Sequence, residues 1–268
     1  MVEDDSAVLG RIFSPFILWR FIVKLTKNYT VRWHETNATR EMTPSAILTL
    51  MQETTNIHMQ QMYPCLEDFR DIKRQAFILS KIFLRFNEPI AAYDDISVST
   101  WTGTESRGFM FWRSFSVQKD GKTVADALSQ WALIDLDGGK LLPVNSFENN
   151  FEDEPSVDIE MPRRIKFPAE RELELAGSKK ITYSDIDYNS HMNNTHYPNM
   201  LVDFLPTPEK YRVKDMMLSF VLGSLYNEEI KIYRVQDGDK FYFRTVNADG
   251  KTCLEAVITT ETQQGEIK

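Results

Sequence analysis

"TVRWHETNATREMTPSAILTLMQE" (residues 30–53) and "KITYSDIDYNSHMNNTHYPNMLVD" (residues 180–203) align without a gap at an offset of 150 residues. Aromatic, apolar and acidic positions coincide along the two stretches, and Met42 aligns with Met192. An internal repeat of this kind decides a fold before any single element does. The chain is therefore expected to contain two copies of one supersecondary unit.

The first copy reads as a strand, a long helix and then further strands. "YTVRW" (29–33) has the alternation and the β-branched and aromatic content of a strand. The helix is predicted over 42–62, with Thr43 as N-cap and Pro44 at the first helical position. Its many apolar residues indicate burial. Three strand-rich segments follow, at 76–87, 94–106 and 109–144.

The second copy repeats this order after a gap. It has a predicted strand at 179–185, a helix at 193–206 and strands within 214–226 and 228–261. Asp-Gly pairs such as those in "KDGK" and "ADGK" are typical of hairpin turns and make the strands antiparallel. The pattern predicts an α+β fold of two antiparallel sheets, each wrapping a central helix.

The domain boundaries follow from composition. Residues 148–162 are acidic, contain proline and lack strand or helix periodicity, so they are predicted to be a linker. It separates an N-terminal domain (26–147) from a C-terminal domain (163–263), with an extension at 1–25. The apolar part of that extension (12–25) is too short and too interrupted by Pro and basic residues for a membrane span. It is expected to pack on the protein without stable membrane insertion.

The overall charge narrows the range of partners. With a formal net charge of −8, the chain is not expected to bind nucleic acid or anionic membranes in general. Its two cysteines, Cys65 and Cys253, are too far apart in sequence for a Cys-x-x-Cys zinc motif. They are expected to be free thiols, as is typical of the reducing cytoplasm.

A polar segment between strand and helix in the second copy stands out. "SDIDYNSHMNNTH" (184–196) places carboxylate and amide side chains at alternate positions, followed by two histidines. The spacing resembles a calcium loop, but a strand precedes it, and the positions that need Gly and a bidentate Glu hold Ser190 and His196. A zinc site is also disfavoured, because His191 and His196 are five residues apart and no Cys is near.

The remaining choice is between a helix-capping turn and a catalytic loop. Asp, Asn and Ser at a strand-to-helix junction commonly serve only as caps, and Asn193, Asn194 or Thr195 suits that role. The comparison of the two repeat copies favours a catalytic role in addition to capping. Where the second copy has Asp187, Asn189 and His191, the first copy has Asn37, Thr39 and Glu41. Among these positions, His191 brings a group that titrates near neutral pH.

"DIDYNSHMNNTHY" resembles the Asp-x-Asn-x-His-x-Asn-Asn segment of the acyl-ACP thioesterases, hydrolases of plants and bacteria with a tandem double hotdog fold. "SAILTLMQET", "LSQWALIDLDGGKLLPV" and "MPRRIKFP" also resemble segments of that family, over roughly residues 26–260. The resemblance implies hydrolysis of fatty acyl thioesters of acyl carrier protein (ACP) in fatty acid biosynthesis, without a cofactor. It implies that Asp187, Asn189 and His191 are catalytic and that the first helix lines the acyl site.

One position departs from the family pattern. The family usually has a catalytic Glu, followed by Cys or Ala, in the next strand; here these positions hold Gly223 and Ser224. Either Asp187 alone activates the reaction, or a neighbour such as Glu228 or Glu229 substitutes, or activity is weak. Gly223 makes a non-catalytic acyl-binding protein one alternative, and a thioesterase that acts on acyl-CoA is another. Unpaired sheet edges also leave a homodimer open.

Overall fold

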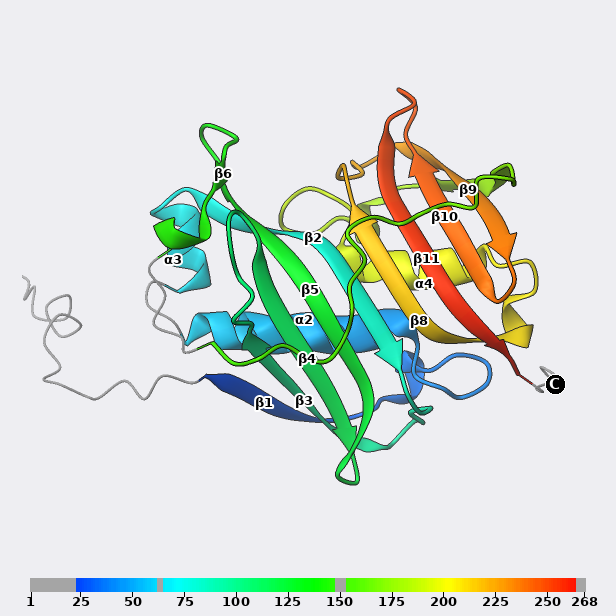
Figure 1. Ribbon diagram of the computed structural model, residues 1–268, viewed down its shortest axis with the longest axis horizontal. Helices are drawn as coiled ribbons and strands as arrows, with labels where there is room; N and C mark the ends of the chain where they lie inside the picture. Colours follow the sequence, from blue (N-terminus) through cyan, green and yellow to red (C-terminus); the bar gives the residue numbers. More distant parts are fainter. Residues whose placement is uncertain (1–22, 62–64, 148–152, 264–268) are drawn as a thin grey trace, which may run out of the picture.

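The structure is a computed structural model that describes residues 23–61, 65–147 and 153–263 (Figure 1). The predicted extension lies almost wholly outside these residues, as do the first five residues of the predicted linker. Within the described residues, the longest and most apolar helices fall short of what crossing a membrane requires.

The N-terminal half contains a strand, a long helix and following strands in the predicted order. The first strand lies earlier than the predicted 29–33, since it ends at Thr30 and Trp33 begins a 3-10 turn. A short helix that the sequence did not indicate, α3, follows α2. The elements are β1 (Lys24–Thr30), α2 (Pro44–Gln60), α3 (Leu66–Asp71), β2 (Gln75–Phe86), β3 (Asp95–Thr102), β4 (Phe111–Lys119), β5 (Lys122–Asp135) and β6 (Leu141–Leu142).

The C-terminal half repeats the arrangement with a shorter helix. A 3-10 turn, η4 (Asn194–His196), leads into α4 (Tyr197–Asp203), which ends earlier than the predicted 206. The strands are β7 (Glu174–Lys180), β8 (Tyr211–Phe220), β9 (Glu229–Asp237), β10 (Lys240–Val246) and β11 (Thr252–Thr262).

All these strands belong to one continuous antiparallel sheet, which corrects the expectation of two separate sheets. The order is β1-β3-β4-β5-β2-β8-β11-β10-β9-β7, with β6 beside β5. The halves join where β2 pairs with β8, from Lys81 opposite Ser219 to Arg85 opposite Asp215. Pairing these two edges satisfies backbone groups that two separate sheets would leave open.

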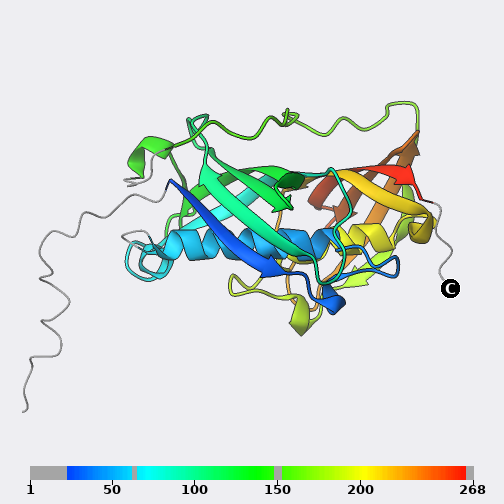
Figure 2. The same ribbon diagram turned by 90° about the horizontal axis from the view of Figure 1, so that it is seen from below.

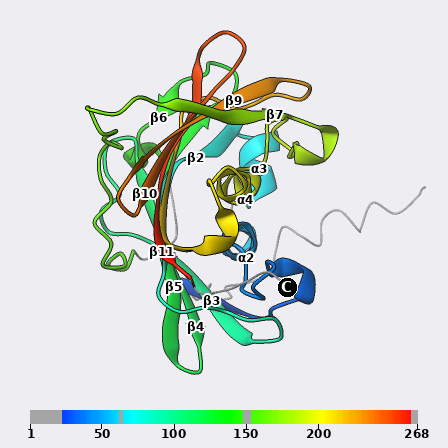
Figure 3. The same ribbon diagram turned by 90° about the vertical axis from the view of Figure 1, so that its right-hand side faces the viewer.

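Helices α2 and α4 lie against the same face of this curved sheet (Figure 3). Helix α2 begins as predicted: Pro44 is its first residue, and the Thr43 side chain accepts a hydrogen bond from the Ala46 N–H. Leu48 and Met51 of α2 are almost completely buried against the sheet. The helices are tied by Ser45 and Asn199, each of whose backbone N–H groups donates to the side-chain oxygen of the other residue.

The described part of the predicted linker crosses the opposite face of the sheet (Figure 2). The Trp101 indole donates to the Pro155 carbonyl at 2.9 Å, and Lys81 donates to the Arg163 carbonyl at 2.6 Å. Most of this connection therefore lies away from the helices, and among its described residues only Asp153 lines the cavity of the candidate site.

Candidate active site

The polar segment forms a tight loop whose shape is set by backbone hydrogen bonds. The N–H of Asp187 donates to the carbonyl of His191 at 2.9 Å, and the N–H of Ser190 donates to the carbonyl of Asp187 at 3.0 Å. Ser190 has a φ of 65°, in the left-handed region. The carboxylate of Asp187 accepts from the N–H of Asn189 at 2.8 Å, so this side chain supports the turn.

The equivalent loop of the first copy has the same geometry. The N–H of Asn37 donates to the carbonyl of Glu41 at 2.8 Å, the N–H of Arg40 donates to the carbonyl of Asn37 at 2.9 Å, and Arg40 also has a φ of 65°. The repeat at offset 150 is thus confirmed at this loop. Because both copies make the same turn, the shape does not require the side chains of Asn189 and His191.

Asp185 and His196 serve the structure of the loop. The Asp185 carboxylate accepts from the N–H and hydroxyl of Thr182, both at 2.8 Å, and pairs with Lys179 at 3.1 Å and with His196 Nδ1 at 3.5 Å. Burial acts to raise the pKa of Asp185, but these hydrogen bonds and Lys179 outweigh it and the pKa lies below its usual range. His196 Nδ1 thus lies beside the Asp185 carboxylate.

The His191 imidazole lies directly over Gly223. Backbone pairing of His191 with Leu225 brings the two segments together. A Cβ atom built on Gly223 would lie 2.2 Å from His191 Cδ2 and 2.8 Å from Nε2, closer than atoms can approach. The absence of a side chain at 223 therefore leaves the room that the imidazole needs in its present position.

Neither neighbouring glutamate replaces the missing acid in this structure. Glu228 accepts from the N–H of Leu225 at 2.9 Å, and Glu229 accepts from the hydroxyl of Ser178 at 2.7 Å. Among the described residues that line the cavity beside His191, neither glutamate is found. Both carboxylates thus support the local backbone and strand.

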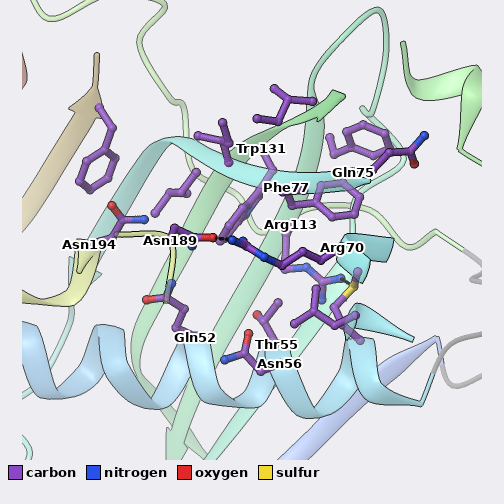
Figure 4. Close-up of a pocket in the computed structure, with 18 of the residues that line it drawn as sticks. Gln52, Thr55, Asn56, Arg70, Gln75, Phe77, Arg113, Trp131, Asn189 and Asn194 are labelled. Carbon is purple, nitrogen blue, oxygen red and sulfur yellow. Dashed lines mark hydrogen bonds between the residues drawn. The ribbon is translucent and has the colours of Figure 1, made fainter. Parts of the chain in front are cut away.

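That cavity has a volume of about 920 Å³ and is built from both halves of the chain (Figure 4). Asp187, Asn189, His191 and Gly223 line it from the C-terminal half. The N-terminal half supplies a wall that is partly aromatic, with Phe77, Phe111, Trp131 and Phe147, and partly polar, with Gln52, Thr55 and Asn56 of α2. The volume is large enough for a sizeable acyl group.

Arg70, on the unpredicted helix α3, reaches across the cavity to the loop (Figure 4). Its Nη1 donates to Asn189 Oδ1 at 2.5 Å, and its guanidinium lies 4.3 Å from the centre of the Tyr188 ring. Because a guanidinium only donates, the amide oxygen of Asn189 points toward Arg70, and the NH₂ group of the same amide points away from it. The N-terminal half thereby orients a residue of the C-terminal loop.

Comparison with protein families shows which family the chain belongs to. The chain matches the acyl-ACP thioesterase N-terminal domain over residues 23–146 and the acyl-ACP thioesterase C-terminal domain over residues 171–264. The chain belongs to the acyl-ACP thioesterase family. Members of this family are thioester hydrolases. A comparison with curated protein sequences found no match.

Solved structures of the acyl-ACP thioesterase fold superimpose on most of the chain. An acyl-ACP thioesterase from Bacteroides thetaiotaomicron shares 20% identity, with a TM-score of 0.78, over 89% of this chain and 98% of that one. A 12:0-ACP thioesterase from Umbellularia californica shares 15% identity, with a TM-score of 0.74, over 90% of this chain and 98% of that one. At these identities the likeness is one of fold.

Two features of the site in this family member were not found from sequence. Arg70 lies in a segment with too short a periodic pattern to indicate a helix. Arg113, which also lines the cavity, could have been found: strand alternation places it on the same face as Phe115 and Val117, which are 2% and 1% exposed. A charged residue at such a position is the signal that was missed.

Proposed function

We propose that this protein hydrolyses the thioester of a fatty acyl chain on acyl carrier protein, as the resemblance implies, with Asp187, Asn189 and His191 as the catalytic residues. The observation that supports this is the shared cavity. The three side chains and Gly223 line one space that continues along α2 and the aromatic wall of the N-terminal half. A thioester placed beside the loop would leave its acyl chain in that space.

The reaction needs a base for water and a donor for the carbonyl oxygen. In our proposal the His191 imidazole, above Gly223, removes a proton from water as the water oxygen bonds to the thioester carbon. The carbon–sulfur bond then breaks, the acid is released, and the proton from His191 goes to the thiolate of the carrier. Each step uses groups that line the cavity.

Asn189 would stabilise the negative charge that develops on the carbonyl oxygen. Its amide oxygen is held by Arg70, so the NH₂ group is available as a donor. Asp187 would hold the loop in shape through the N–H of Asn189. In this scheme no carboxylate at position 223 is needed to activate water.

Thiol release from acyl-ACP, with His191→Ala and Asn189→Ala as variants, tests the proposal. Each substitution is expected to lower kcat/KM by about 100-fold or more. His196→Ala is a matched control, because this histidine belongs to the same loop but pairs with Asp185. Acyl binding without thiol release by the wild type would identify a non-catalytic acyl-binding protein. Equal or faster turnover of acyl-CoA with the same chain would reassign the carrier.

We also propose cytoplasmic action, consistent with free thiols at Cys65 and Cys253. Each predicted domain, 26–147 and 163–263, would be one hotdog unit of the tandem. The end strands β1 and β7 each have one strand neighbour in the described sheet, which offers a route to a homodimer. Light scattering of the purified protein would show whether that state forms.

A further inference from the structure

Arg113 of β4 is a buried cation in the wall of the cavity (Figure 4). It is 6% exposed and faces α2. Burial lowers the pKa of Arg113 to about 10, so the guanidinium remains charged at neutral pH. A charge removed from water in this way is costly unless another group compensates for it.

The groups that contact Arg113 are electrically neutral. Nη1 donates to His58 Nδ1 at 3.1 Å and to Thr100 Oγ1 at 3.2 Å, and Nη2 lies 3.6 Å from Met59 Sδ. Since Arg can only donate, His58 Nδ1 accepts and this imidazole is neutral with its proton on Nε2. These contacts give the N–H donors of Arg113 hydrogen-bond partners, but they supply no opposite charge.

Carboxylate partners distinguish Arg113 from other arginines of the chain. Arg85 pairs with Asp126 at 2.9 Å, and Arg244 pairs with Glu255 at 2.7 Å. Among the residues that the structure describes, no carboxylate oxygen lies within 4.0 Å of the Arg113 guanidinium. Asp153, an exposed residue that also lines the cavity, attracts it only from a greater distance.

The wall near Arg113 is also more polar than a hydrocarbon chain requires. Helix α2 presents Gln52, Thr55 and Asn56 to the cavity (Figure 4). Gln52 Oε1 and, on β3, Thr102 Oγ1 are buried without a hydrogen-bond partner within the described part of the chain. An alkyl chain in the space beside these atoms would leave them without a hydrogen-bond partner, which costs free energy.

We propose that the acyl chain of the substrate carries a carboxylate away from the thioester, and that Arg113 binds this carboxylate inside the cavity. The inference rests on the proposed thioesterase function and specifies its substrate class. A guanidinium matches a carboxylate with two parallel donors, which a buried site makes strong and selective. Hydrolysis proceeds as for any thioester and yields a dicarboxylic acid and the carrier thiol.

Kinetics with two substrates of equal chain length on the same carrier test this specificity. One acyl chain ends in a carboxylate and the other in a methyl group. The wild type is expected to favour the carboxylate by about tenfold or more in kcat/KM. Arg113→Met is expected to reduce kcat/KM for the carboxylated substrate about tenfold more than for the other. Arg244→Met removes an arginine from β10, in the C-terminal half of the same sheet, and should leave the substrate ratio unchanged.

A binding measurement keeps the proposal testable if Arg113→Met fails to fold or if neither thioester is hydrolysed. The wild type is titrated with the monomethyl ester of a long dicarboxylic acid and with its dimethyl ester, following the Tm. Only the monoester has a carboxylate, and it is expected to raise the Tm more. Equal effects of the two esters, or a wild type that prefers the methyl-ended thioester, would overturn the proposal. A larger monoester effect with no hydrolysis would retain the Arg113 site and reject the thioesterase function.

Discussion

Gly223→Ala tests the position of His191 with the smallest possible change. The added Cβ would lie 2.2 Å from His191 Cδ2, 2.7 Å from Cγ and 2.8 Å from Nε2. Ordinary contact between carbon atoms begins at about 3.5 Å, so the ring must move by about 1.3 Å. The three close atoms include Cγ, and a rotation of the far edge of the ring therefore does not relieve the contact.

The expected loss is in activity and not in stability. A displacement of about 1 Å of a catalytic group lowers the rate by about 100-fold, equivalent to about 2.7 kcal/mol. His191 is exposed and can turn toward solvent. Gly223 does not have a positive φ, so alanine fits its backbone. Alanine also lowers the conformational entropy of the unfolded chain, which raises the free energy of unfolding by about 0.4–1 kcal/mol. Gly223→Ala should thus lower kcat/KM about 100-fold with an equal or higher Tm.

A double-mutant cycle with His191→Ala separates the ring contact from other effects. Both kcat/KM for acyl-ACP and Tm are measured for the wild type, the two single variants and the double variant. Once the imidazole is removed, the methyl group introduced at position 223 has nothing to displace and is expected to change kcat/KM little further. Wild-type activity in Gly223→Ala, or an equal loss in the His191→Ala background, would refute the reasoning. Gly223→Glu is expected to displace His191 in the same way.

Three further predictions concern the loop and the join between halves. Arg70→Met should lower kcat by about 10–100-fold with little change in KM, because Asn189 loses a charge-assisted hydrogen bond; an effect confined to KM in steady-state kinetics would contradict this. Because the pKa of Asp185 is lowered by folding, its carboxylate stabilises the protein above the ordinary value of about 3.9, and this contribution disappears as pH falls through the lowered pKa. Asp185→Asn should therefore cost about 1–3 kcal/mol of unfolding free energy at neutral pH, with a difference from wild type that shrinks in acid; urea titrations showing a constant difference would argue against it. Leu84→Ala, at a fully buried position opposite Met216, should cost about 2–5 kcal/mol and preserve a single calorimetric transition, whereas two transitions would mean that the halves unfold separately.

Local sequence signals predicted the order of the elements and the start of the long helix. Thr43 and Pro44 marked the start of α2, and the Asp120–Gly121 pair forms the turn between β4 and β5 with positive φ at both residues. The repeat predicted that the loops around Asn37 and Asp187 share one backbone shape. Each of these signals is contained in a few neighbouring residues, so one sequence is enough to interpret it.

Features that depend on distant contacts were not predicted. The pairing of β2 with β8 joins residues more than a hundred positions apart, and nothing local in Arg85 or Asp215 specifies it. Arg70 comes to Asn189 from a six-residue helix in the other half. The steric role of Gly223 likewise depends on where His191 lies. The roles of Asp187, Asn189 and His191 in catalysis stay predictions.

The equivalent loops at 37–41 and 187–191 make different side-chain contacts, and this difference bears on how many acyl groups one chain binds. At the position that matches His191, the first copy has Glu41, whose carboxylate lies 3.5 Å from Arg212, which in turn pairs with Glu261 at 2.9 Å. Duplication gave the chain two loops of one shape, but the first is tied into an ion-pair network while the second faces the cavity. Each chain is therefore expected to turn over a single acyl group at a time, and a titration should saturate at one ligand per polypeptide.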